Sequence, residues 1–210
     1  METKTNDTEC HILAAAEHLF TERGFNAVST TDIAREAGCN QALVHYYFRT
    51  KENLFQTVFV AKLNGLLARL QAPIADEDDI FAIVRHIVDT YFDILADCPQ
   101  LPVFFLNELV LNRERALLMR DTLERNLLRH DFFVRFSAAL RRAAERGEVR
   151  RVEPLDYYLD IISLVVFSHI AQPMLVQPDV GDNSSDYLDR RRREVCTLLS
   201  EGLKISPSAQ

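Results

Sequence analysis

The feature that most constrains this chain is a pair of very short helical segments between residues 29 and 48. The stretch reads STTDIAREAGCNQALVHYYF, and Gly38 and Cys39 interrupt it near its middle. A helix of about eight residues is marginal on its own in water. Two such helices joined by a tight turn must therefore be held by a third element, and the second helix can then present one face outward.

The ends of both short helices carry residues that start and stop helices. Ser29 precedes the first helix and has an acidic residue three positions later, as in a capping box. Gly38 supplies the left-handed residue that ends a helix, and Asn40 is a strong N-cap for the second one. In the second helix, Val44 and Phe48 lie four residues apart and are expected to face inward. The segment is therefore predicted to be a helix-turn-helix.

The opposite face of the second helix has residue types that contact DNA. The second helix of a helix-turn-helix enters the major groove. There a glutamine can pair bidentately with adenine, and small apolar side chains can meet the methyl group of thymine. An aromatic run such as residues 45–48 could instead be plain core, but the caps, the turn and the polar face occur together. The residues predicted to contact DNA are Ser29, Thr30, Thr31, Asn40, Gln41, Ala42, Leu43, His45, Tyr46, Tyr47 and Lys51.

The charge of the chain does not by itself point to nucleic acid. The net charge is −7, and residues 1–62 carry six lysines and arginines against eight aspartates and glutamates. Nucleic-acid binders usually concentrate positive charge on the binding surface. Contacts with phosphate are therefore expected to come from a few placed groups, which predicts a weak dependence of binding on salt.

The remainder of the chain is predicted to be helical as well, which makes the fold class all-α. Apolar residues recur at the helical period in segments 9–23, 51–71, 78–96, 102–112, 113–146, 154–172 and 185–204. Signals for β-hairpins are missing, and no repeat of fixed period is present. We predict a three-helix helix-turn-helix domain over residues 1–55 and a C-terminal helical bundle over residues 56–205.

Other functional classes find little support in the sequence. The polar N-terminus lacks a secretory segment, and IISLVVF at 161–167 is too short to span a bilayer, so we expect a cytoplasmic protein that does not contact membranes. The four cysteines have no metal-binding spacing and are expected to be buried thiols. The sequence shows no nucleophile, base and orienting group close together, and no glycine-rich phosphate loop. We therefore predict no enzyme, catalytic residue, metal or cofactor.

The stretch GFNAVSTTDIAREAGCNQALVHYYFRTKENLF closely resembles the N-terminal signature of the TetR (tetracycline-repressor-like) family of bacterial transcriptional regulators. The resemblance covers residues 9 to about 60 and includes the Gly-Phe turn, the Ala-Gly turn and the Lys-Glu-x-Leu start of the next helix. Three positions depart from the family pattern: Cys39 replaces the usual valine, Asn40 the usual serine, and His45 the usual first tyrosine. The remaining chain matches only in length and helical character.

The resemblance implies a homodimeric, all-α DNA-binding regulator, which we expect to be a repressor, in which each N-terminal domain reads half of a palindromic operator in double-stranded DNA. The C-terminal helices would form a dimer interface and a pocket for an unidentified small-molecule effector, hydrophobic or amphipathic, that releases the DNA. An architectural or cell-division DNA-binding protein of the same fold, without an effector, is the alternative. By position, Thr30, Thr31 and Lys51 would contact phosphate or bases.

Two residue sets in the C-terminal part are candidates for these roles. The aromatic residues could equally be ordinary bundle core. The candidate pocket residues are Phe81, His86, Phe92, Phe104, Phe105, Phe132, Phe136, Phe167 and His169. The candidate dimer-interface residues are Leu159, Ile162, Val166, Ile170, Leu188, Val195, Leu198 and Leu199. The run Arg190–Arg193 is expected to be a solvated helix face.

Overall fold

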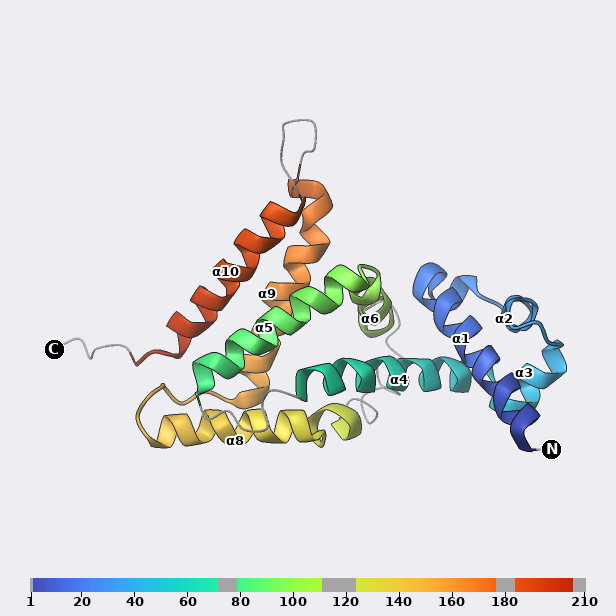
Figure 1. Cartoon of the computed structure of the whole chain (residues 1–210), viewed down its shortest axis with the longest axis horizontal. Coiled ribbons are helices and arrows are strands. Elements are labelled where there is room, and N and C mark those ends of the chain that lie inside the picture. The colour runs from blue at the N-terminus through green and yellow to red at the C-terminus, as the bar shows by residue number, and fades with distance from the viewer. Residues whose placement is uncertain (1, 72–78, 111–123, 177–183, 206–210) are drawn as a thin grey trace. The chain divides into compact units, whose positions relative to one another are not determined.

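The computed structural model describes residues 2–71, 79–110, 124–176 and 184–205 (Figure 1). These residues contain helices and no β-strand, so the predicted all-α fold is confirmed. The chain divides into two compact units. Unit 1 comprises residues 1–65 and 100–126, and unit 2 comprises residues 66–99 and 127–210. The sequence placed the domain boundary after residue 55 and assigned residues 100–126 to the C-terminal domain, so the observed division differs on both points.

Unit 1 contains the helix-turn-helix. Its helices are α1 (Glu2–Ala27), α2 (Thr30–Glu36), α3 (Gln41–Phe48), the first part of α4 (Lys51–Gln71) and α6 (Leu101–Val110). Helix α2 packs against both α1 and α3 (Figure 1). Helix α1 starts seven residues before the predicted position, and near its end Gly24 leaves the helical conformation with φ 75°.

Aromatic side chains form the core of unit 1. Phe20 of α1 and Phe25 stack at 5.8 Å between ring centroids, and each meets the edge of Phe55 from α4 at 5.2 Å. Phe55 and Phe59 in turn contact Phe104 of α6 at 5.5 and 6.0 Å. Offset and edge-to-face ring pairs of this kind stabilise a core beyond their buried area. This packing explains why α6 belongs to the unit that carries the short helices.

Unit 2 is a helical bundle. It contains α5 (Ile80–Asp97), α8 (Asp131–Glu145), α9 (Pro154–Leu175) and α10 (Ser184–Leu203). Helix α10 packs along α5 and α9, and α8 packs against the same two helices (Figure 1). At its centre Tyr158 is almost fully buried among Phe132, Phe133 and Phe136, with ring centroids 5.7 to 6.0 Å away.

The prediction of one continuous helix over residues 113–146 is wrong, because the helix is interrupted before Asp131, although residues 131–145 are helical as expected. A short π-helical turn, η2 (Glu124–Leu128), ends before residue 130, and α8 starts anew at Asp131. His130 has extended backbone angles, and its ring nitrogen accepts a hydrogen bond from the N–H of Phe132 at 3.2 Å. A histidine cap is uncommon, and no glycine or proline marks the break. Residues 111–123 lie outside the described part.

Helix α9 is longer and more apolar than the sequence pattern indicated. It continues past the predicted end at residue 172, with Pro173 inside its last turn. Its 22 residues contain an 18-residue window of mean hydropathy 1.4, so by length and composition it could cross a membrane. The sequence expectation considered only residues 161–167, whereas the helix that contains them is 22 residues long. A helix at the core or at an interface of a water-soluble protein meets the same criterion, and one side of α9 packs on α5, α8 and α10.

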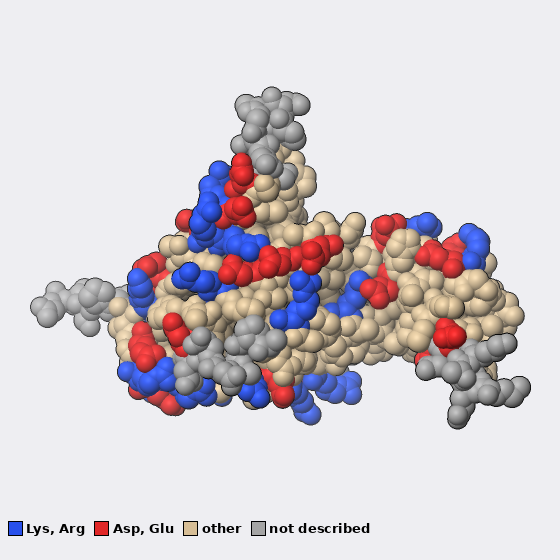
Figure 2. Space-filling model, in the orientation of Figure 1, with Lys and Arg blue, Asp and Glu red and all other residues tan. Residues whose placement is uncertain are grey.

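The arginine run on α10 is only partly a solvated face. Arg192 pairs with Asp93 of α5 at 2.6 Å and approaches Asp89 at 3.8 Å, and Arg191 donates to the Ser168 hydroxyl of α9 at 3.3 Å. Arg190 and Arg193 are exposed. Figure 2 shows a row of acidic side chains beside basic side chains in this region. Two of the four arginines therefore fasten α10 to its neighbours.

Candidate DNA-binding surface

The turn between α2 and α3 is built from the caps that the sequence indicated. The Ser29 hydroxyl accepts from the N–H of Asp32, and the Asp32 carboxylate accepts from the N–H of Ser29, both at 3.1 Å. The Ser29 hydroxyl also donates to the Asp32 carboxylate, and this bond, together with the one from the Ser29 N–H, holds the pKa of Asp32 below its usual range. The Asn40 side chain accepts from the N–H of Leu43 at 3.0 Å, and Gly38 has φ 66°. The predicted helix-turn-helix is therefore present with both N-caps.

Helix α3 has one buried side and one exposed side. Val44 and Phe48 are 2% and 7% exposed, as the spacing predicted. Leu43 and Tyr47 are half-buried at the edges. The exposed side consists of Gln41, Ala42, His45 and Tyr46, and Tyr46 is 66% exposed. We call these four residues the reading face. They are free to meet another molecule because the packing of α3 uses the other side.

Hydrogen bonds hold parts of the reading face in place. The side-chain nitrogen of Gln41 donates to the hydroxyl oxygen of Thr30 at 2.8 Å, which joins α3 to the start of α2. His45 Nδ1 lies 3.2 Å from the backbone carbonyl oxygen of Arg49, which can only accept. The side chains of Gln41 and His45 are therefore oriented before any ligand binds.

A hollow of about 580 Å³ lies beside the reading face, where the starts of α2 and α4 come together. Ser29, Thr30, Arg49, Thr50 and Lys51 are among the residues that line it. Thr50 caps α4 by accepting from the N–H of Asn53 at 3.1 Å. A helix N-terminus with neighbouring cations favours an anion such as a phosphate group.

Lys51 is less available than the resemblance implied. Its ammonium group donates to the carbonyl oxygens of Phe25 and Val28 at 2.9 and 2.7 Å, and it lies 4.0 Å from the centre of the Phe25 ring. Two of its three donors therefore hold the chain between α1 and α2 against the start of α4. Its charge still contributes to the hollow that it lines. Lys51 thus shapes this surface as well as supplying charge to it.

Arg49 is a surface residue that the sequence reading did not select. Its guanidinium group has no ion pair or hydrogen bond with any residue that the structure describes, and it lines the hollow. It is also the one residue other than glycine with positive φ in the described ranges, at φ 65° and ψ −57°. L-residues rarely adopt this conformation, and such strain often marks functional sites. Only the folded backbone reveals it, since a sequence shows no φ.

Replacing Arg49 by glycine is expected to stabilise the protein while weakening DNA binding. Glycine adopts positive φ without strain, so the free energy of unfolding should rise by about 1 kcal/mol. The matched control is Arg49→Ala, which loses the same charge but keeps the strain. Urea denaturation of both variants separates the effects. Equal stability of the glycine and alanine variants would show that the backbone at this position is unstrained.

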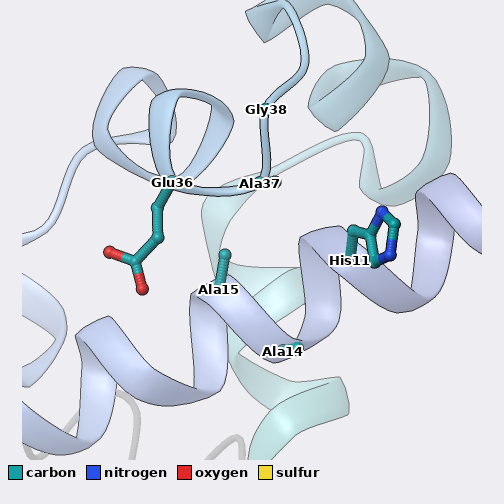
Figure 3. A pocket seen from close by; sticks show the side chains of 6 residues that line it. All are labelled: His11, Ala14, Ala15, Glu36, Ala37 and Gly38. Atoms are coloured by element: carbon teal, nitrogen blue, oxygen red, sulfur yellow. The ribbon is translucent and has the colours of Figure 1, made fainter.

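Contacts from α1 also position α2. His18 Nδ1 lies 2.6 Å from a carboxylate oxygen of Glu36, and both side chains are partly exposed. Further along, Ala37 at the end of α2 lies close to Ala15 of α1, and both border a hollow (Figure 3). The hollow of about 450 Å³ there has polar side chains only from His11 and Glu36, at opposite ends (Figure 3). Its chemistry does not indicate a ligand site.

The structure divides the candidate pocket residues between the two units. Phe104 and Phe105 belong to unit 1, where both contact Phe59. In unit 2, Phe92, Phe132 and Phe136 are buried, whereas Phe81, His86 and His169 are half-buried. Phe167 is 69% exposed, so its assignment to an enclosed pocket is wrong. The helical spacing of residues 161–170 identified an apolar helix but could not separate its covered side from its uncovered side.

A polar group inside unit 2 was missed by the sequence reading. The hydroxyl groups of Tyr91 on α5 and Tyr158 on α9 are hydrogen-bonded to each other in the core. Burial raises the pKa of both tyrosines above the usual value. His169 lies on the Phe92 ring at 4.9 Å, and burial lowers its pKa. Tyrosines within an apolar stripe look like core residues in a sequence, so no local signal distinguished them.

The candidate dimer-interface residues also fall into different environments. Leu159, Ile170 and Leu198 are 49%, 38% and 47% exposed, and Ile162, Val166 and Leu188 are half-buried. Val195 and Leu199 are 0% and 4% exposed, so their prediction as interface residues is wrong: they pack inside unit 2. The predicted buried thiols need a correction too, because Cys10 is exposed and the other three cysteines are half-buried.

Comparison with known proteins agrees with this geometry. The family of bacterial regulatory proteins called tetR matches residues 12–58, which span the helix-turn-helix. The regulator YfiR of Bacillus subtilis is 29% identical over 150 residues, which cover 70% of each chain. UidR of Escherichia coli, also an HTH-type transcriptional regulator, is 30% identical over 88 residues, covering 42% of this chain and 45% of UidR.

The likeness extends to the whole fold among solved structures. The transcriptional regulator FadR from Bacillus subtilis, solved in complex with stearoyl-CoA, superposes with a TM-score of 0.72 over 93% of this chain and 99% of FadR, at 18% identity. At that identity the superposition establishes the fold alone. The matched segment and the two related regulators assign the helix-turn-helix part of this chain, residues 12–58, to the tetR family of bacterial regulatory proteins.

Proposed function

We propose that the protein is a homodimeric repressor that binds a palindromic operator through residues 29–48 and is released by a small hydrophobic or amphipathic effector. The observation that carries the DNA-binding part is the two-sided character of α3. Val44 and Phe48 anchor the helix, while Gln41, His45 and Tyr46 remain exposed on the reading face. A recognition helix must have these two sides, since it packs on its own domain and enters the major groove at once.

An exposed apolar stripe on α9 supports the homodimer. Leu159, Phe167, Ile170 and Met174 are 49%, 69%, 38% and 82% exposed, and their spacing places them along one side of the helix. Contiguous exposed apolar surface commonly marks an interface, and a palindromic operator requires a two-fold symmetric reader. A second copy of the chain would cover this stripe and present two reading faces to successive major grooves.

The interior of unit 2 supports a response to an amphipathic effector. Its core is rich in phenylalanine and contains the hydroxyl groups of Tyr91 and Tyr158 as polar groups. Ligand sites are mostly apolar with a few placed polar groups. Because FadR of Bacillus subtilis was solved with stearoyl-CoA, a long-chain acyl-CoA is the first compound to test. Release of the operator on addition of stearoyl-CoA is the expected result.

Mapping the binding sites of the protein across its genome tests the DNA-binding proposal. A repressor of this kind is expected to occupy one or a few promoter regions, its own among them, at sequences with two-fold symmetry. The neighbouring genes would then indicate the regulated process. Many dispersed sites without a shared palindrome would contradict the proposal and favour an architectural DNA-binding protein.

Operator binding is expected to depend only modestly on salt. Among the residues that line the hollow beside the reading face, Arg49 and Lys51 are the lysine and arginine side chains. With roughly two phosphate contacts per subunit, the slope of log K against log salt for a dimer should be about −4. Fluorescence anisotropy with labelled operator at several salt concentrations measures it. A slope near roughly −10 would mean that many more phosphates are contacted than this surface can supply.

A further inference from the structure

We propose that Thr30 fixes the side-chain amide of Gln41 so that Gln41 presents only its carbonyl oxygen to the DNA. Gln41 then reads an amino group on the base edge, and adenine and cytosine are both accepted at that position. Thr30 acts as a positioning residue through Gln41 and does not itself have to touch the base. This inference rests on the proposed DNA-binding function and concerns the specificity of the same surface.

The first observation is the bond between the two side chains. The Gln41 side-chain nitrogen donates to the Thr30 hydroxyl oxygen at 2.8 Å, a good hydrogen-bond length. Thr30 is half-buried at the first position of α2, and Gln41 is exposed at the first position of α3. Since α2 and α3 are fixed against each other by the turn, the bond holds the amide in one place.

The second observation decides which end of the amide faces the protein. His45 Nδ1 lies 3.2 Å from the carbonyl oxygen of Arg49, so Nδ1 must carry the hydrogen. In the neutral imidazole, His45 Nε2 is then an acceptor, and it lies 3.5 Å from the Gln41 side-chain nitrogen. The contact is long and weak, but it decides the orientation of the amide. An amide oxygen placed there would face the lone pair of His45 Nε2 and be repelled. Both amide hydrogens therefore point toward the protein.

The consequence follows from the major-groove edges of the bases. Adenine N6 and cytosine N4 are donors, whereas guanine O6 and thymine O4 are acceptors. A freely turning glutamine prefers adenine because it also donates to N7. In this chain Thr30 and His45 hold the amide hydrogens, so the bidentate adenine pair expected from the sequence is not available. An outward oxygen accepts from either amine and is repelled by the keto oxygens of guanine and thymine.

Selection from a random double-stranded DNA library with the purified full-length protein tests the proposal. The position read by Gln41 is the one whose base preference disappears in Gln41→Ala. There the wild type should enrich adenine and cytosine about tenfold over guanine and thymine, the size expected for one hydrogen bond. Thr30→Val removes the oxygen at nearly constant shape, and the enrichment of cytosine should fall roughly tenfold at that position alone.

Two conservative variants distinguish positioning from a general structural role. Thr30→Ser keeps the hydroxyl group and should keep the wild-type preference. Gln41→Glu has acceptors only, so it should keep the preference for cytosine while its added negative charge weakens binding to every sequence. Thermal unfolding of each variant verifies that the domain is folded, so a change in preference cannot be attributed to unfolding.

Several results would overturn the inference. An unchanged cytosine enrichment in Thr30→Val would do so, as would a wild type that selects adenine alone at the Gln41 position. Equal loss of affinity for all sequences in Thr30→Val, with the preference intact, would assign Thr30 to a phosphate contact only. If the wild type enriches no sequence at all, the proposed DNA-binding function fails first, and that failure is distinct from the other outcomes.

Discussion

Removing the side chains of Gln41 and Tyr46 together is expected to lower operator affinity by roughly 100-fold, at ~1–2 kcal/mol for each lost base contact. Both residues are on the reading face, and Tyr46 is 66% exposed, so neither side chain supports the core of unit 1. The free energy of unfolding should fall by no more than about 1.5 kcal/mol, the contribution of the lost hydrogen bond between Gln41 and Thr30. Anisotropy with the mapped operator gives the affinity, and urea denaturation gives the stability.

The control for this double variant is an exposed position outside unit 1. Val134 on α8 is 52% exposed and belongs to unit 2. Val134→Ala is expected to leave operator affinity as in the wild type. Wild-type affinity in the Gln41→Ala, Tyr46→Ala double variant would show that α3 reads DNA by another face, and the assignment of the reading face would then be abandoned.

Replacing Phe20 by alanine is expected to destabilise unit 1 by about 3–5 kcal/mol, the usual cost of removing a buried phenylalanine ring. Phe20 is 0% exposed and contacts the rings of both Phe25 and Phe55. The cavity left behind is bounded by α1 and α4, whose packing holds the short helices. Operator binding should therefore fall in proportion to the unfolded fraction, although Phe20 touches no DNA.

Urea denaturation and thermal unfolding measure the effect of Phe20→Ala, and Phe20→Leu is the matched control because it refills most of the volume. The leucine variant is expected to lose less than half as much stability as the alanine variant. A loss below about 1 kcal/mol in Phe20→Ala would mean that the Phe20–Phe25–Phe55 cluster does not support the domain as described.

The opposite expectations for Tyr46 and Phe20 follow from the side of the helix on which each lies, exposed for Tyr46 and buried for Phe20, and not from residue type. Sequence spacing alone separated the two sides of α3 correctly, because a helix of eight residues with two anchors four apart has only one way to bury both. The same reasoning failed on α9 and α10. There apolar residues occur on more than one side, so periodicity did not show that Phe167 is exposed or that Val195 and Leu199 are buried.

Residue type alone predicted some hydrogen-bond partners correctly and others incorrectly. The caps Ser29 and Asn40 were predictable because their hydrogen bonds reach only three residues along the chain. Lys51 was assigned to phosphate by resemblance, yet its ammonium group bonds the carbonyl oxygens of Phe25 and Val28. His130 interrupts the helix predicted over residues 113–146 because its ring caps the start of α8. Contacts between distant residues, or an uncommon cap, leave no pattern in a local window.

The sequence by itself determined the all-α class, the helix-turn-helix with its caps, and which side of α3 faces outward. Each of these depends on interactions within about four residues, so short spacings in the chain specify them. The tertiary structure decided that α6 joins the first unit, that Lys51 holds the α1–α2 turn, and that Thr30 and His45 orient the Gln41 amide. These features need groups from different helices to meet at hydrogen-bond or ring-contact distance, which only the packed chain brings about.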